Sequence, residues 1–262
     1  MVIYVILDSM LLNSIIREFF VNENPIVLYK PFGFIHLLFI FLCFIATIII
    51  YHNRNKISKI SRKNIDKILK TCAVILLLNM IIYTFGNLYY GSFDYKEMLP
   101  FHLCFIANYM FIYAILFNKE SILKITLFMS FIGPIPAILW PDLVSTIDNY
   151  NFWQLIISHH FFLNVSLFSY YSLNYSIKKN DIHVVFIFLN TILLISYPLN
   201  KSFNTNYIFT NYIPDNVLEL YPFLDGIPAL LILEIVGMII LFLTYKLVIN
   251  NRNKELSKNN LQ

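Results

Sequence analysis

The chain has 262 residues, of which 58% are hydrophobic and only 13% are charged. Soluble domains usually carry about 25% charged residues, so this composition excludes an ordinary soluble protein and favours a membrane protein. The net charge of +4 comes from basic residues gathered in a few loops, without a basic groove rich in aromatic residues, so we expect no nucleic-acid partner.

The N-terminal segment differs from the rest of the chain. It lacks the basic start and the small-residue cleavage site of a signal peptide. Its apolar positions recur at helical spacing around the polar residues Asp8, Asn13 and Arg17. We therefore predict an interfacial amphipathic segment over residues 1–30, lying at the membrane surface.

Long apolar segments follow this N-terminal part. A helix needs about 20 residues to cross the hydrocarbon core of a bilayer. The segments that reach roughly this length are 34–51, 68–90, 99–117, 122–140, 152–175, 182–200 and 227–249. They predict an all-α, polytopic helical bundle of about seven transmembrane helices over residues 31–250, followed by a polar cytoplasmic tail over 251–262.

The loops between these segments alternate in positive charge. Those on one side of the membrane hold fourteen Lys and Arg residues, and those on the other side hold four. Loops rich in Lys and Arg stay in the cytoplasm, so we expect the N-terminus outside and the C-terminus in the cytoplasm. The chain is thus predicted to be a multi-pass protein of the cell membrane.

With this orientation, the unusual polar residues of the spans gather in the outer half of the bilayer. Ionisable residues within a membrane are costly and usually face a cavity, although any single one can serve only as a link between helices. We therefore predict an outward-opening polar pocket. Its candidate residues are His36, His102, Cys104, Asn108, Asp142, His159, His160 and Glu234.

Cys104 is the candidate nucleophile of this pocket. On a regular helix, residues two apart point about 200° apart, so His102 would not share a face with Cys104, whereas Asn108 would. A base for the thiol is then expected from the fifth span. His159 and His160 lie about 100° apart there, and periodicity does not choose between them.

A metal site is the other chemical interpretation of these residues. The ligands available for zinc would be His36, His102, His160 and either Asp142 or Glu234. No HxxxH or HExxH pair places two ligands on one helical face, so we predict no metal and no cofactor.

Several strings that carry these polar residues resemble a known family. They are FGFIH with His36, EMLPFHLC with His102 and Cys104, FIGPIPAILWPDL with Asp142, FWQLIISHHFF with His160, and NTNYIF with Asn206 and Tyr207. Their order and spacing over roughly residues 30–235 resemble the YwaF-like bacterial integral membrane proteins. Those proteins look related to the eukaryotic transmembrane protein 164 family, which is described as a membrane acyltransferase of phospholipids.

The resemblance implies a multi-span helical bundle and acyl-chain chemistry on membrane lipid. Cys104 matches the cysteine thought to carry the acyl group, and His160 fits the family's span-five histidine better than His159 does. A lipid acyltransferase or lipid hydrolase follows, with Cys104, His160 and His102 as candidate catalytic residues and membrane lipid as the partner. The candidate substrate-binding residues are His36, Asn108, Asp142, His159, Asn206, Tyr207 and Glu234.

Two other functions fit the same residues. A small-molecule transporter or a ligand-binding membrane protein without catalysis would use the same cavity, and Gly133, Pro134 and Pro136 interrupt the fourth span as the broken helices of transporters do. A non-catalytic assembly partner would use the polar residues only as links between helices. The sequence leaves open whether the chain forms a homo-oligomer.

Overall fold

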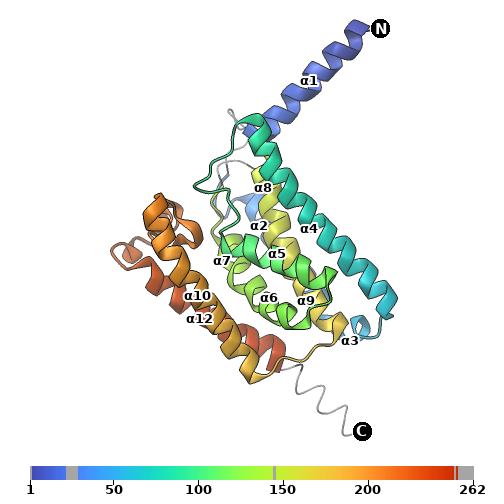
Figure 1. The fold of residues 1–262 in the computed structure, drawn as a ribbon, viewed down its shortest axis with the longest axis vertical. Coiled ribbons are helices and arrows are strands. Elements are labelled where there is room, and N and C mark those ends of the chain that lie inside the picture. The colour runs from blue at the N-terminus through green and yellow to red at the C-terminus, as the bar shows by residue number, and fades with distance from the viewer. Residues whose placement is uncertain (1, 22–28, 144–145, 251, 253–262) are drawn as a thin grey trace.

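The computed structural model describes residues 2–21, 29–143, 146–250 and 252, and within these ranges the chain is helical and contains no strand (Figure 1). The helices, in chain order, are α1 Val2–Val21, α2 Phe34–His52, α3 Arg54–Ile57, α4 Arg62–Tyr90, α5 Leu103–Leu116, α6 Glu120–Ile132, α7 Pro134–Leu139, α8 Tyr150–Leu155, the π-helical turn η1 Ile156–Phe161, α9 Phe162–Leu173, α10 Lys179–Phe203, the 3₁₀ turn η2 Tyr207–Phe209, α11 Asp215–Leu220, the 3₁₀ turn η3 Pro222–Leu224, α12 Ala229–Thr244 and the π-helical turn η4 Tyr245–Ile249.

Five helical segments are long and apolar enough to cross a membrane. They are Phe34–His52, Arg62–Tyr90, Glu120–Leu139, Lys179–Phe203 and Ala229–Ile249. Helix α5 is also apolar but has only 14 residues. The all-helical membrane character expected from the composition is thus confirmed, and the helices place the protein in a lipid environment.

The centre of the bundle is built from α4, α5, α6 and α9, which pack on one another (Figure 1). Each contributes a fully buried apolar side chain: Leu76, Phe111, Phe128 and Phe162 respectively. The rings of Phe111 and Phe162 meet edge to face with centroids 5.6 Å apart. Bulky side chains on the inner faces of these helices therefore hold the core that positions the candidate site.

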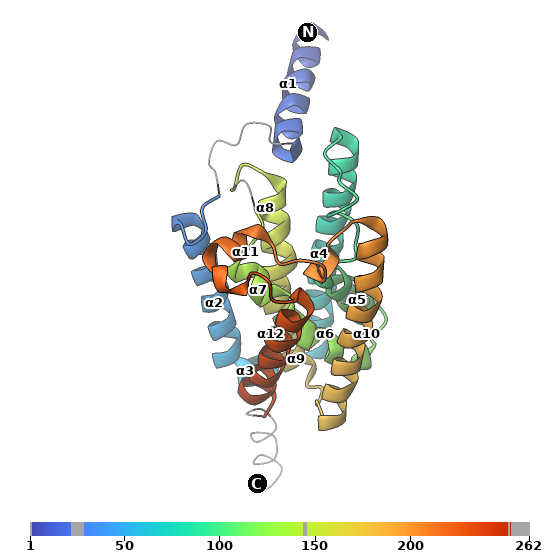
Figure 2. The same cartoon turned by 90° about the vertical axis from the view of Figure 1, so that its left-hand side faces the viewer.

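Helices α2, α10 and α12 form the outer layer. In Figure 2, α2 and α10 lie on opposite sides of the central helices. Only 11% of the apolar stretch of α10 is buried inside the protein, and only 17% of that of α12. The apolar stretch of the span that contains α6 is 56% buried. Both α10 and α12 pack on α6 and expose most of their apolar surface, as helices that face lipid do.

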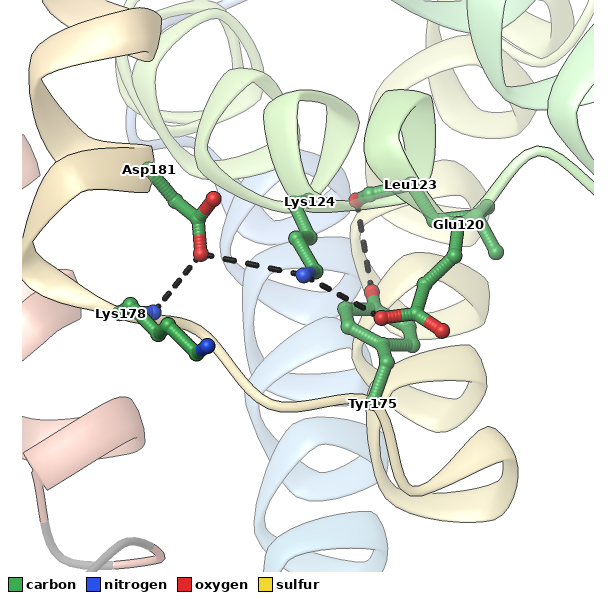
Figure 3. A network of polar contacts seen from close by, with 6 residues as sticks. All are labelled: Glu120, Leu123, Lys124, Tyr175, Lys178 and Asp181. Atoms are coloured by element: carbon green, nitrogen blue, oxygen red, sulfur yellow. Dashed lines mark hydrogen bonds and ion pairs between the residues drawn. The ribbon is translucent and has the colours of Figure 1, made fainter.

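Helix α10 is also tied to α6 by charge at the end where α10 begins (Figure 3). The ammonium group of Lys124 lies 3.2 Å from Glu120 and 3.8 Å from Asp181. Asp181 in turn accepts a hydrogen bond of 2.7 Å from the backbone N–H of Lys178, just before α10. The start of α10 is therefore held against α6.

The span formed by α6 and α7 is interrupted, as Gly133 and Pro134 predict. Helix α6 ends at Ile132 and α7 begins at Pro134. The break lies beside the start of α5, because a Cβ atom added to Gly133 would be 3.8 Å from the backbone nitrogen of Cys104. The break thus packs against the turn of Cys104, at a distance where a Cβ atom would make an ordinary van der Waals contact.

The fifth apolar segment is not a regular α-helix throughout. The expected separation of about 100° between His159 and His160 assumed that it was. Its helix runs from α8 to α9 through the π-helical turn Ile156–Phe161. A side chain of this turn bonds to the backbone of α8, since Ser158 Oγ donates to the carbonyl oxygen of Gln154 at 2.7 Å. Turns of this kind are rare, and they frequently occur at functional sites.

Helix α1 contacts the bundle through its last turn. Phe20 is buried against the ring of Tyr90, with centroids 5.5 Å apart, and against Tyr150. A Cβ atom at Gly86 would lie 2.2 Å from the Phe20 ring, so only glycine permits this approach. Residues 1 and 22–28 of the predicted interfacial segment, and residues 251 and 253–262 of the predicted tail, lie outside the described residues.

Candidate functional site

His102 lies directly before α5 and contacts the turn formed by residues 207–209. The backbone N–H of Ile208 donates a hydrogen bond of 3.3 Å to His102 Nδ1. The imidazole also meets the ring of Tyr207 edge to face at 5.0 Å and the ring of Phe209 at 5.5 Å. Because Nδ1 accepts here, the neutral imidazole carries its proton on Nε2.

The turn that contacts His102 is held in place by Asn200, a fully buried residue of α10. Its Nδ2 donates to Tyr207 O at 2.7 Å and to Thr210 Oγ1 at 2.8 Å. Its Oδ1 accepts from Thr205 Oγ1 at 2.7 Å and from Tyr207 N at 2.9 Å. This network holds Ile208 at φ 59°, which is unfavourable for a β-branched residue.

Asn206 and Tyr207 have different surroundings within the same loop. The Asn206 side chain accepts from Asn211 N and Tyr212 N at 3.1 and 3.3 Å, and donates to Tyr212 O at 3.0 Å. The phenol of Tyr207 donates to the carbonyl of Tyr95. Asn206 therefore shapes its own loop, whereas Tyr207 lies against His102.

Cys104 is half-buried in the first turn of α5, and Asn108 lies one turn further on. Asn108 Nδ2 donates to Cys104 O at 2.7 Å and to Ser158 O, in the π-helical turn, at 3.0 Å. Asn108 Oδ1 is buried and has no hydrogen-bond partner among the described residues. The phenol of Tyr83 is within electrostatic range of the Cys104 thiol. The turn of Cys104 is thus joined to the turn that carries both histidines.

His159 is oriented by its own turn. Its Nδ1 lies 3.0 Å from Leu155 O and 2.9 Å from Ser158 Oγ. A carbonyl oxygen only accepts, so Nδ1 carries the proton and Nε2 keeps its lone pair. The ring lies within electrostatic range of His102. His159 is therefore an imidazole whose orientation is fixed by its own turn.

His160 differs from His159 because both of its ring nitrogens lack a partner. The residue is buried, and neither Nδ1 nor Nε2 has a hydrogen-bond partner in the described part of the chain. It lies within electrostatic range of His159 and His36. A buried polar group without a partner is uncommon and is often explained by a catalytic role or by a bound molecule.

His36 links α2 to α7. Its Nδ1 accepts from the backbone N–H of Phe32 at 2.9 Å, and its Nε2 donates to Ile138 O at 2.8 Å. Both nitrogens of this buried residue are therefore occupied. This arrangement serves to position the two helices on one side of His160.

Cys43 and Asn164, which lie beside His160, were not among the candidate site residues chosen from the sequence. Asn164 Nδ2 donates to His160 O at 2.9 Å and lies 3.5 Å from Cys43 Sγ. Thr47 donates to Cys43 O at 2.9 Å and to Asn164 Oδ1 at 3.1 Å. The available signal was the spacing of four residues between His160 and Asn164 and between Cys43 and Thr47, which places each pair on one helical face.

Asp142 lies in the loop after α7, on the same side of the molecule as Glu97, a residue that the sequence did not single out. Partial burial raises the pKa of Asp142, and the nearby Asp215 raises it further. Burial also raises the pKa of Glu97, with smaller contributions from Asp142 and Asp94. These carboxyl groups accordingly hold a proton more readily than ordinary ones.

Glu234 lies apart from the other candidate residues. It lines a pocket between α6, α10 and α12 together with Asn190 and Gly237. The candidate residues thus divide into two sets. One contains Cys104, Asn108, His102 and the histidines of the π-helical turn, with His36 beyond them, and the other contains Glu234. In the described ranges, no three His, Cys, Asp or Glu side chains converge as metal ligands would.

One comparison with known proteins gave a match. The model of the TMEM164 family matches residues 28–245, a region that contains every candidate site residue and all helices from α2 to α12. No curated protein and no solved structure matches the chain.

Proposed function

The chain belongs to the TMEM164 family, and from this premise we propose that it is a membrane enzyme that transfers acyl groups of lipids through Cys104. One observation supports this proposal most directly. His160 is a buried imidazole with two unpartnered nitrogens, and its turn is hydrogen-bonded through Asn108 to the turn of Cys104. Acyl transfer needs such a pairing of a nucleophile and a base that can reach a bound substrate.

The proposed reaction has two steps. In the first, the Cys104 sulfur attacks the carbonyl carbon of a lipid ester, its proton passes to His160, and a C–S bond forms as the ester C–O bond breaks. The alkoxide that leaves takes the proton from His160. In the second, a hydroxyl group of an acceptor lipid attacks the thioester, its proton passes through His160 to the thiolate, and the C–S bond breaks. Water as the acceptor would give lipid hydrolysis.

The other residues have supporting roles in this proposal. The neutral His159, fixed through Nδ1, keeps the turn of His160 in place, and His102 carries a proton on Nε2 that can be donated to a developing oxyanion. His36 positions α2 and α7. Tyr207 and Asp142 are assigned the headgroup of a lipid that enters from the outer side.

The membrane arrangement belongs to the same proposal. Each of the seven apolar segments of the sequence contains a helix, although α5 is short and the fifth contains a π-helical turn. We place residues 31–250 in a single transmembrane domain of the cell membrane, with residues 1–30 at the outer surface and 251–262 in the cytoplasm. The excess of Lys and Arg on one side supports this orientation.

A specific observation favours a second function, ligand binding or transport without chemistry. The interruption between α6 and α7 at Gly133 and Pro134 lies beside Cys104, and broken helices often line transport sites. In that case a lipid or another small molecule would bind at the same residues and leave unchanged.

Acyl exchange between a labelled phospholipid and an unlabelled lysophospholipid, in vesicles that contain the purified protein, distinguishes the two functions. The wild-type protein should move label to the acceptor, Cys104→Ala should not, and His160→Ala should be slower by about 10²–10⁴-fold. His183→Ala, which changes an exposed histidine of α10, is the control. Lipid binding without exchange by the wild-type protein would instead support the second function.

A further inference from the structure

A second feature of the molecule is a pocket between α6, α10 and α12 that is partly open to the surface. Its walls are mainly apolar, and they extend from Leu103 and Ile208 at one end to Phe186 and Leu241 at the other. Helices α10 and α12 each pack on α6, which closes the pocket from behind. The exposed apolar surfaces of α10 and α12 flank the other side, where lipid tails would lie.

This pocket adjoins the proposed catalytic residues. Leu103 immediately precedes Cys104 in the first turn of α5. Ile208 also lines the pocket, and its backbone N–H donates to His102 Nδ1. The pocket therefore reaches the turn that carries Cys104, and it extends along α12 from Leu233 to Leu241.

We propose that this pocket holds the acyl chain whose carbonyl group is bound to Cys104. The inference rests on the proposed function, because it assigns the pocket a part of that reaction's substrate. Lipid tails are as apolar as the pocket walls, so moving a chain from the bilayer into the pocket adds little hydrophobic free energy. The pocket acts instead by its shape, and it selects chains by the length and bulk that it accommodates.

Gly237 gives the pocket much of its room. No atom lies within 4 Å of a Cβ atom added at this position. Gly237 is in the middle of α12, where a larger residue such as leucine also favours the helix more than glycine does. Gly237→Leu therefore fills the pocket without disturbing the fold. Ile235→Phe, which enlarges a side chain that is 47% exposed on the same helix, is its matched control.

Glu234 identifies the main competing occupant. Its carboxyl group lies in the pocket wall less than one helical turn from Gly237, and the structure gives it no hydrogen-bond or ion-pair partner among the described residues. A charged residue within a membrane usually pairs with a cation, so an organic cation would depend on Glu234. An acyl chain would not depend on its charge. Glu234→Gln separates the two occupants.

The test uses phospholipids with a photoreactive group near the end of a short or a long acyl chain, in vesicles that contain the full-length protein. The wild-type protein should be crosslinked within residues 233–241 of α12. Gly237→Leu should lower the ratio of long-chain to short-chain crosslinking, and the same ratio for acyl exchange, about tenfold. Ile235→Phe should leave both ratios unchanged, and Glu234→Gln should retain the crosslinking to α12.

Two results would overturn the inference. In one, Gly237→Leu leaves both ratios at the wild-type value, so the pocket holds no chain. In the other, Glu234→Gln abolishes crosslinking while Gly237→Leu has no effect, so crosslinking depends on the charge of Glu234 and not on the room that Gly237 leaves. Crosslinking does not require turnover. Crosslinking on α12 without acyl exchange would therefore contradict the proposed function alone, and exchange without crosslinking there would contradict the pocket assignment alone.

Discussion

Asn108 of α5 donates a hydrogen bond of 3.0 Å to the carbonyl oxygen of Ser158, in the π-helical turn that carries His159 and His160. The same amide nitrogen donates to Cys104 O at 2.7 Å. One side chain thus fixes the distance between the turn of the proposed nucleophile and the turn of the proposed base. This arrangement explains how a cysteine and a histidine from different spans can act on one substrate.

Replacing Asn108 should separate these two turns. Asn108→Ala removes an interhelical hydrogen bond of a kind that contributes about 0.6 kcal/mol, and at most about 2 kcal/mol, in membrane proteins. We expect a small loss of thermal stability in detergent but a loss of acyl exchange of tenfold or more, because small displacements of reacting groups reduce rates strongly. Asn53→Ala is the control, since Asn53 Nδ2 donates to Ile49 O, four residues earlier in α2. An equal effect of both variants on exchange would contradict the linking role.

His36 should matter for stability more than for chemistry. His36→Ala leaves a part-buried backbone N–H of Phe32 and a buried carbonyl of Ile138 without their partner. We expect a loss of about 1–3 kcal/mol in the free energy of unfolding, measured by thermal or denaturant unfolding in detergent. The exposed His183, replaced by alanine, should cause no comparable change. Unaltered stability of His36→Ala would show that α2 and α7 are held by other contacts.

The carboxyl groups of Glu97 and Asp142 predict how stability depends on pH. Burial raises the pKa of Glu97, and Asp142 and Asp94 add to this; burial and Asp215 raise the pKa of Asp142. The folded protein then binds these protons more tightly than the unfolded chain does, so stability decreases as the pH rises above the ordinary carboxyl pKa of about 4.

The double variant Glu97→Gln, Asp142→Asn should consequently unfold at a higher temperature than the wild type at pH 7, by a few degrees at most because both groups keep contact with water. The gain should shrink as the sample is acidified. Asp225→Asn, which changes another exposed carboxyl group, is the control. A gain that stays constant down to acidic pH would rule out protonation as its cause.

Hydropathy was sufficient to predict the helical membrane class, because a run of about twenty apolar residues marks a spanning helix whatever its partners are. The break at Gly133 and Pro134 was also visible in the sequence, since proline cannot continue a helix without loss of a hydrogen bond. The geometry that places Asn108 one turn after Cys104 is equally local, and the hydrogen bond between Asn108 and Cys104 O confirms it.

The rest of the candidate site depends on contacts between distant parts of the chain. The π-helical turn changes the facing of His159 and His160, and helical periodicity carries no signal for it. Cys43 reaches Asn164 across 121 positions of sequence. Glu234 lines the pocket between α6, α10 and α12, and its place there depends on how α10 and α12 pack on α6.

The central claim is that Cys104 carries an acyl group, and intact-protein mass spectrometry after incubation with phospholipid vesicles tests it most directly. We predict a mass increase of one acyl group that neutral hydroxylamine removes, as it does from a thioester. The adduct should be present in Cys43→Ala and Cys72→Ala and absent from Cys104→Ala. An adduct that persists in Cys104→Ala, or a wild-type protein that stays unmodified while it exchanges acyl groups, would contradict the account.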